Sequence, residues 1–172
     1  HSGHGAATDS EKAGDVEILN DSLARELTAI EAFAQGMALM HGQPLALARQ
    51  LRGQDQAYVD ALTKSIRGLG GETEAEAGEL EPPGPRSQAE ALAFAYEGEN
   101  AALAGSLDAA PRLQTPAPRA LAAALSAGHA QHLVLLRQAL GADLLAASPE
   151  PFEPGDLPPP AIGGEGPEGA NR

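Results

Sequence analysis

Apolar residues recur at spacings of three and four positions in four separate stretches of the chain, residues 15–40, 45–69, 87–109 and 118–145. This spacing places the apolar side chains on one face of an α-helix. Aromatic residues make up only 3% of the chain, so alanine and leucine, which favour helix over strand, must form most of the core. The sequence therefore predicts an all-α protein with four helices.

Three kinds of break separate the predicted helices. The sequence His-Gly-Gln-Pro at 41–44 and the glycine pair at 70–71 are short turns. Residues 72–86 contain five glutamates and three prolines, a composition that neither packs in a core nor stays helical. Ser87 and Glu90 then have the spacing of a helix-capping pair. Since simple up-and-down bundles need no long connection, we predict an antiparallel four-helix bundle with one long crossover between the second and third helices.

The two ends of the chain differ in composition from the middle. Residues 1–14 are small and polar and are predicted to form a flexible arm. Residues 148–172 are rich in proline, glycine and glutamate and are predicted to be a disordered tail. With 172 residues, the chain suits a single bundle domain, residues 15–147. It begins with histidine, which favours a processed protein that is exported to the periplasm or the cell exterior.

The net charge of −13 excludes several classes of partner. An acidic protein is repelled by phosphate backbones and anionic lipids, so we expect neither nucleic-acid binding nor attachment to a membrane surface. No stretch approaches the run of about 20 apolar residues that crosses a bilayer, so no membrane insertion is expected. The chain has no cysteine, which excludes thiolate metal sites. A homodimer is compatible with the sequence, and protein partners stay unidentified.

Each predicted helix carries at least one polar residue on its apolar face, near its middle. A buried seam normally excludes such residues, because a buried polar group without a partner is costly. By contrast, Glu31 and Glu97 lie off these faces and are expected to be solvated. The polar residues on the apolar faces are Glu26, Asp55, Tyr58, Glu99, His129 and His132.

The spacing of these polar residues repeats between the two halves of the chain. Glu26 lies 29 residues before Asp55 in the first half. Glu99 lies 30 residues before His129 in the second half. In both halves another polar side chain follows three positions later, which indicates a duplicated helical hairpin. The alignment pairs Glu26 with Glu99, Asp55 with His129 and Tyr58 with His132.

This arrangement is similar to the ferritin-like superfamily, in which two helices each supply a glutamate and two supply Glu-x-x-His motifs. The stretches LNDSLARELTAIEAF, YVDALTKSIRGLGG and GHAQHLVLLRQALG resemble exported, desiccation-associated ferritin-like proteins of bacteria. The resemblance covers residues 15–145. It implies a role in metal handling or in protection against oxidative and desiccation stress, with Glu26 and Glu99 as the terminal carboxylates.

Three of the six ligand positions depart from the family pattern. Asp55 shortens a glutamate, Tyr58 replaces a histidine, and His129 replaces a glutamate. Because bridging carboxylates neutralise a pair of metal ions, a di-iron oxidase or ferroxidase ranks last among the functions considered. Glu99, His129 and His132 are instead predicted to hold a single divalent ion (Fe, Mn, Zn or Cu), with Asp55 as a fourth ligand or hydrogen-bond acceptor. Glu26 and Tyr58 are predicted to fill the vacated half, hydrogen-bonded to each other.

Two alternatives stay open. In the first, the buried polar groups satisfy one another, and the bundle is a non-enzymatic structural or interaction scaffold without metal. In the second, the amino terminus with His1 and His4 chelates copper, although ordering a flexible arm is costly, so a disordered end is favoured. Met37 and Met40 are expected to fill the core rather than to bind metal. Enzymatic activity is left open, and a non-enzymatic role is favoured.

Overall fold

The computed structural model describes residues 6–80 and 82–141 of the 172-residue chain. Within these residues the backbone forms four α-helices and no strand. The helices are α1 (Asp9–Met37), α2 (Gly42–Gly68), α3 (Gln88–Arg112) and α4 (Pro116–Ala139). The predicted all-α fold class is therefore confirmed.

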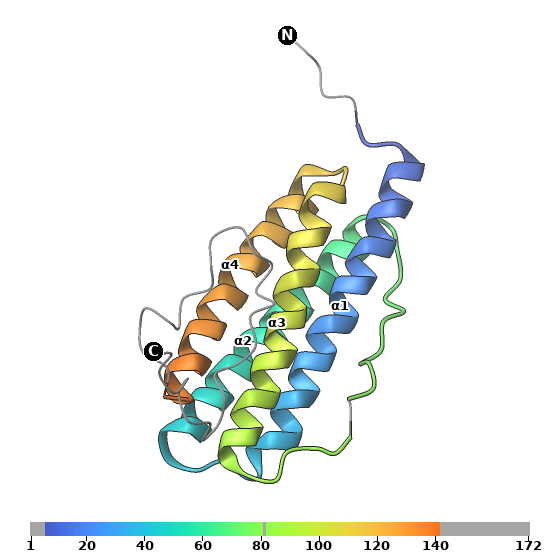
Figure 1. The fold of residues 1–172 in the computed structure, drawn as a ribbon. Helices are drawn as coiled ribbons and strands as arrows, with labels where there is room; N and C mark the ends of the chain where they lie inside the picture. Colours follow the sequence, from blue (N-terminus) through green and yellow to red (C-terminus); the bar gives the residue numbers. More distant parts are fainter. Residues whose placement is uncertain (1–5, 81, 142–172) are drawn as a thin grey trace, which may run out of the picture.

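The helices form a bundle of two antiparallel hairpins, α1–α2 and α3–α4 (Figure 1). α1 packs against α2 and α3, and α3 also packs against α4. α2 and α4 are neighbours too, but they pack far less extensively than the other three pairs. The connection from α2 to α3 runs along the side of α1 from one end of the bundle to the other. This is the predicted four-helix bundle with a crossover between its second and third helices.

Hydrogen bonds from α1 hold the acidic crossover in place. The Asn20 amide nitrogen donates to the Glu72 carbonyl at 3.0 Å, and the Glu74 N–H donates to the Asn20 side-chain oxygen at 3.0 Å. Farther along, the Gly78 N–H donates to the Thr28 hydroxyl at 2.8 Å. The crossover is therefore attached through polar contacts, which explains how a segment so poor in apolar residues follows a fixed path.

The glycine pair at 70–71 ends α2, as predicted. Gly70 has a φ of +83°, in the left-handed region that glycine adopts without the strain a side chain would cause. The Gly71 N–H donates to the Ile66 carbonyl at 3.0 Å and closes the last turn of the helix. A Cβ on Gly71 would lie 2.6 Å from both methyl groups of Val16. Gly71 therefore also allows the crossover to start close to α1.

The helix ends differ from the prediction in several places. α1 begins at Asp9, six residues before the predicted start at 15, because Thr8 and Glu11 form a complete capping box. Residues 9–14 of the predicted arm are therefore helical. α1 ends at Met37 rather than 40, and α4 begins at Pro116 rather than 118. α4 ends at Ala139, and Leu140 and the left-handed Gly141 (φ +88°) form a turn, so the fourth helix does not run unbroken to 145 as predicted. Residues 1–5 and the predicted tail 148–172 lie outside the described residues.

A buried carboxylate joins α1 to the start of α4. The two Asp15 oxygens accept the N–H groups of Gln114 and Thr115 at 2.8 Å each, and Asp15 also accepts the Thr115 hydroxyl. Free N–H groups at a helix start need such acceptors, and the positive end of the helix dipole favours an anion. Asp15 therefore acts as a cap supplied from another helix.

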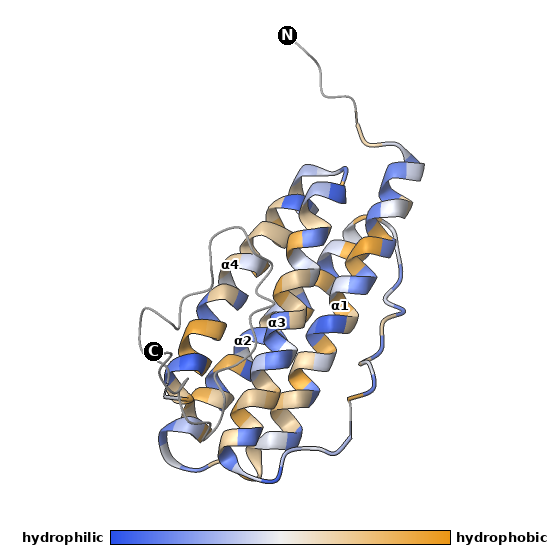
Figure 2. Cartoon of the chain, in the orientation of Figure 1, coloured by the Kyte–Doolittle hydropathy of each residue, from blue (hydrophilic) through white to orange (hydrophobic). Residues whose placement is uncertain are grey.

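Apolar side chains pack in two clusters, one on each side of the middle of the bundle, and every helix contributes to both. In Figure 2, hydrophilic and hydrophobic residues alternate along each helix, as expected of helices with one buried face. Leu107 lies four residues after the buried Leu103, but its side chain is 40% exposed. Each step of four residues rotates the helical face by about 40°, so three such steps from Ala95 carry Leu107 out of the core.

Candidate metal centre

Five ionisable side chains lie buried between the two apolar clusters. They come from all four helices, and each is at most 2% exposed. The sequence placed all of them on buried faces, and the structure brings them together. The five are Glu26 on α1, Asp55 on α2, Glu99 on α3, and His129 and His132 on α4.

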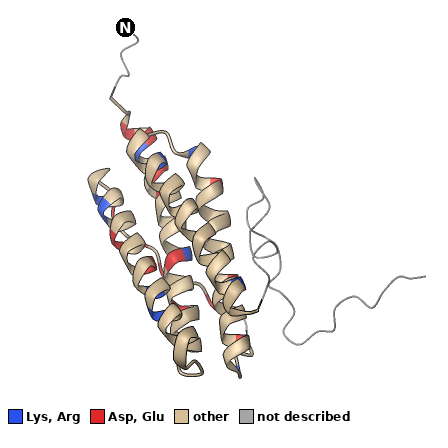
Figure 3. Ribbon diagram, turned by 90° about the vertical axis from the view of Figure 1, so that its left-hand side faces the viewer, with Lys and Arg blue, Asp and Glu red and all other residues tan. Residues whose placement is uncertain are grey.

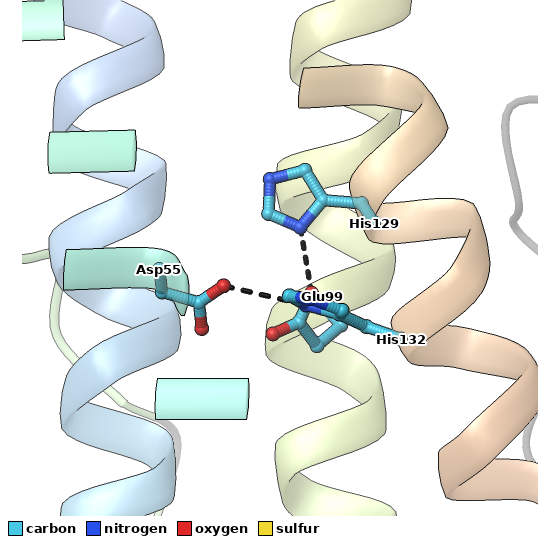
Figure 4. A group of neighbouring side chains, drawn as sticks. All are labelled: Asp55, Glu99, His129 and His132. Carbon is cyan, nitrogen blue, oxygen red and sulfur yellow. Dashed lines mark hydrogen bonds and ion pairs between the residues drawn. The ribbon is translucent and has the colours of Figure 1, made fainter. Parts of the chain in front are cut away.

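Four of these residues offer ligand atoms to one small volume. One oxygen or nitrogen atom from each of Asp55, Glu99, His129 and His132 lies within 4.8 Å of the others. In Figure 4, Asp55 points from α2 toward the side chains carried by α3 and α4. The two histidines reach the same volume because residues three apart share a helix face. The geometry therefore assembles two carboxylates and two imidazoles around one point.

His129 lies between two carboxylates. Its Nδ1 is 2.6 Å from Glu99 Oε2, and its Nε2 is 2.6 Å from Glu26 Oε1. Burial alone would lower the pKa of His129, but the hydrogen bonds to Glu26 and Glu99 outweigh burial and raise the pKa to about 10. His129 is therefore an imidazolium at neutral pH when no metal is bound, and both ring nitrogens donate.

His132 is held from three sides. Its Nδ1 lies 3.1 Å from Glu99 Oε2 and 3.4 Å from Asp55 Oδ1. Its Nε2 donates to Gln54 Oε1 at 2.6 Å. Burial would lower the pKa of His132, but the neighbouring carboxylates of Asp55 and Glu99 outweigh it and raise the pKa to about 9. Because the Gln54 oxygen keeps a proton on Nε2, the Nδ1 atom is the one that can bind a metal at the centre.

The carboxylates divide into one charged group and two whose charged form is disfavoured. Burial would raise the pKa of Glu99, but hydrogen bonds from both histidines outweigh it and lower the pKa to about 2. Burial raises the pKa of Asp55 to about 8. Burial also raises the pKa of Glu26, against the opposing hydrogen bond from His129. The centre therefore holds protons that a cation can replace.

Four buried carboxylate oxygens accept no hydrogen bond: Glu26 Oε2, Glu99 Oε1 and both oxygens of Asp55, one of which has only the 3.4 Å ion pair with His132 Nδ1. Buried polar atoms in folded proteins are almost always paired, because burial without a partner costs free energy. Three of the four belong to Asp55 and Glu99, which are in the four-residue group. A metal ion bound there would supply the missing partner, so these residues fit a divalent cation.

Tyr58 lies beside the centre but outside the four-residue group. Its half-buried ring stacks on His132 with ring centres 5.9 Å apart, and it meets the edge of His129 at 5.3 Å. The predicted hydrogen bond between Glu26 and Tyr58 is wrong. Glu26 bonds to His129 instead, and the Tyr58 hydroxyl lies against Gly128 on α4.

The sequence did not identify Gln54 as part of the site. Gln54 is exposed and lies off the apolar face of α2, so periodicity gives no reason to select it. The other residues weighed for metal binding have different outcomes. Met40 is buried in the core, and the half-buried Met37 packs against the same cluster, which confirms their predicted role. His1 and His4 lie outside the described residues.

An all-α bundle with carboxylates and imidazoles from four helices buried at its centre defines the ferritin-like class of protein. A family model described as "Ferritin-like domain" matches residues 14–142. The chain therefore belongs to the ferritin-like domain family. No match to a curated protein was found.

Solved structures share this fold. A conserved hypothetical protein from Mycobacterium tuberculosis matches with a TM-score of 0.70 and 23% identity, over 77% of this chain and 94% of that one. DpsC from Streptomyces coelicolor matches with a TM-score of 0.69 and 18% identity, over 83% and 92%. A structure from Bacillus anthracis, described as ferritin-like, diiron-carboxylate proteins, matches with a TM-score of 0.63 and 19% identity, over 76% and 97%. These likenesses concern the fold alone.

Acidic and basic residues are interspersed along the helices (Figure 3). Within residues 6–80 and 82–141, no helix combines the length and the apolar character needed to cross a membrane.

Proposed function

We propose that the protein binds one divalent transition-metal ion at the centre of the bundle. The proposed ligands are Asp55, Glu99, Nδ1 of His132 and Nδ1 of His129. The observation that carries the proposal is the set of carboxylate oxygens that are buried without partners beside two imidazoles. Carboxylate and imidazole ligands suit Fe, Mn, Zn and Cu, and the donor set alone does not choose among these metals.

The charges of the proposed ligands favour one metal ion over two. Asp55 and Glu99 supply two negative charges, and neutral imidazoles supply none, so the four ligands neutralise one divalent cation. A second cation would depend on Glu26, one of whose oxygens is bonded to His129. In addition, an imidazole stands where the family pattern has a bridging carboxylate. These residues do not fit a pair of iron ions, so we propose no di-iron chemistry.

As a biological role, we propose metal handling in an exported protein during oxidative or desiccation stress. The support is membership of the ferritin-like domain family together with the buried ligand set. Complementation of a strain from which the gene has been deleted tests this role. The strain receives either the wild-type gene or the His132→Ala gene, and its survival after drying or peroxide treatment is measured. Equal rescue by both genes would contradict a metal-dependent role, and cell fractionation tests the proposed location.

A metal-free scaffold is the second candidate, and one observation favours it. His129 pairs with Glu26 and Glu99 at 2.6 Å each, so part of the cluster is satisfied without any ion. The two candidate functions differ in how they account for the carboxylate oxygens that accept no hydrogen bond. Under the scaffold hypothesis these oxygens stay unpaired and the protein binds no metal at the centre.

Elemental analysis of the untagged full-length protein separates the candidates. After equilibration with Fe, Mn, Zn or Cu and removal of free ion, we expect about one equivalent of the preferred metal in the wild type. His132→Ala should lose this metal. Glu31→Ala should retain it, since Glu31 is exposed on α1. Less than about 0.1 equivalent for every metal would contradict the proposal, and two equivalents lost together in His132→Ala would contradict a single-ion centre.

A further inference from the structure

We propose that Tyr58 closes the centre on the side where α2 meets α4, and that its ring limits the rate at which metal enters and leaves. This inference rests on the proposed metal binding, because it assigns a means of access to the same site. Tyr58 is thus a lid rather than a ligand, and Gly128 provides the space in which the lid sits.

Tyr58 lies between the buried imidazoles and the solvent. It is half-buried, whereas His129 and His132 are at most 1% exposed. The Tyr58 ring lies nearly parallel to His132, at 17°, and meets His129 edge-on, at 73°. One phenol therefore covers both imidazoles and keeps part of its own surface accessible to solvent.

The hydroxyl end of Tyr58 occupies a notch in α4 that only glycine provides. A Cβ on Gly128 would lie 2.0 Å from Tyr58 Oη and 2.8 Å from Cζ. Real side chains do not approach so closely, so an alanine at 128 would force the phenol to move. Gly128 directly precedes His129 on α4. The position of the lid is therefore set by the backbone next to a proposed ligand.

The duplicated hairpin shows what the lid replaces. In the alignment of the two halves, Tyr58 corresponds to His132, and Gly128 corresponds to Gln54. In one half, Gln54 accepts a hydrogen bond from His132 and fixes the orientation of that imidazole. In the other half, the equivalent pair is a phenol seated against a glycine. That pair has no donor or acceptor directed at the centre, so it excludes solvent without adding a ligand.

The packing of the helices makes this side the access route. α2 and α4 are the least extensively packed of the four neighbouring helix pairs. Tyr58 lies on α2 and touches α4 at this seam, one turn from Gln54. The other three seams are more extensively packed, so displacement of the Tyr58 ring would open the centre to solvent at the least packed seam.

The release of bound Zn²⁺ to excess chelator tests the lid in the full-length protein. We expect Gly128→Ala and Tyr58→Ala each to release the metal at least about tenfold faster than the wild type, as expected when a loosened lid gates exchange. Tyr58→Phe keeps the ring and should release metal at the wild-type rate. Gly14→Ala is the matched control, since nothing lies within 4 Å of a Cβ there. Wild-type rates in both Gly128→Ala and Tyr58→Ala would overturn the proposal.

A second readout does not depend on metal binding. Hydroxyl-radical footprinting, in which oxidised histidines are mapped by mass spectrometry, reports which imidazoles solvent reaches, whether or not the imidazole is protonated. In the wild type and Tyr58→Phe, His129 and His132 should be protected relative to the exposed His41, whereas Tyr58→Ala should expose them. Protection in Tyr58→Ala would overturn the lid even if metal binds. If Tyr58→Ala exposes the two imidazoles but the wild-type protein binds no metal, the covering role of Tyr58 is supported and only the proposed function is refuted.

Discussion

Metal affinity should depend steeply on pH, because the proposed ligands carry protons before metal binds. The pKa values of His129 and His132 are raised to about 10 and about 9, and that of Asp55 to about 8. A metal ion binds only the deprotonated forms. Between pH 6 and pH 7.5, all three groups hold protons in the metal-free protein, so binding must release two protons from the imidazoles and a third from Asp55.

The direction and size of the effect follow from this proton release. The apparent association constant should rise with pH, by about 100- to 1,000-fold per pH unit for two or three released protons. Ordinary histidines, with a pKa near 6.5, would give almost no pH dependence above pH 7.5. Isothermal titration calorimetry in buffers of different ionisation enthalpy counts the protons directly. Release of less than one proton per metal at pH 7 would refute the proposed charge state of the centre.

Variants at three further residues test separate parts of the structure. Glu26→Gln replaces the carboxylate that accepts the Nε2–H of His129 with an amide and should lower the free energy of unfolding of the metal-free protein by about 2 kcal/mol in urea titrations. The metal stoichiometry should stay unchanged, and loss of the metal would make Glu26 a ligand. Gln54→Leu should weaken metal affinity about 10- to 100-fold, because the ring of His132 loses the hydrogen bond that orients it. Gln54→Glu keeps an acceptor oxygen and should restore the affinity. Equal affinity in the wild type and both variants would show that Gln54 is not part of the site. Asp15→Asn should cost about 1–3 kcal/mol of stability by weakening the cap of α4 without changing metal content, and an unchanged urea midpoint would contradict that role.

The membership of the centre could be predicted from the sequence because charge on an apolar helical face is conspicuous. Glu26, Asp55, Glu99, His129 and His132 each interrupt a face that otherwise consists of apolar residues. Such an interruption costs free energy unless the groups meet partners. The faces of the four helices point to one core, so the partners had to be one another or a metal ion.

The pairing inside the centre could not be predicted in the same way. Whether Glu26 bonds to Tyr58 or to His129 depends on which side chain fills the space between helices, and periodicity carries no information on that. Gln54 reaches His132 from an exposed position of α2, across a loosely packed seam. The Gly128 notch likewise depends on the exact approach of a ring from another helix.

Contacts between distant residues also escaped prediction. Asp15 caps a helix that begins about 100 residues later in the chain, so no local sequence pattern identifies this contact. The early start of α1 did have a local signal, the capping pair Thr8 and Glu11. That signal lies in a stretch of small polar residues, whose composition favours a flexible arm. Leu107 fits the apolar spacing and is still exposed, because repeated four-residue steps rotate the helical face away from the core.

X-ray absorption spectroscopy of the metal-loaded full-length protein tests the central claim most directly. One ion held by Asp55, Glu99, His129 and His132 should give a shell of oxygen and nitrogen neighbours with the multiple-scattering pattern of two imidazoles. No metal–metal distance near 3.5–4 Å should be present, since such a distance marks a two-metal site. A metal–metal distance in that range, or a bound ion without imidazole neighbours, would contradict the claim that this bundle holds a single metal ion at its centre.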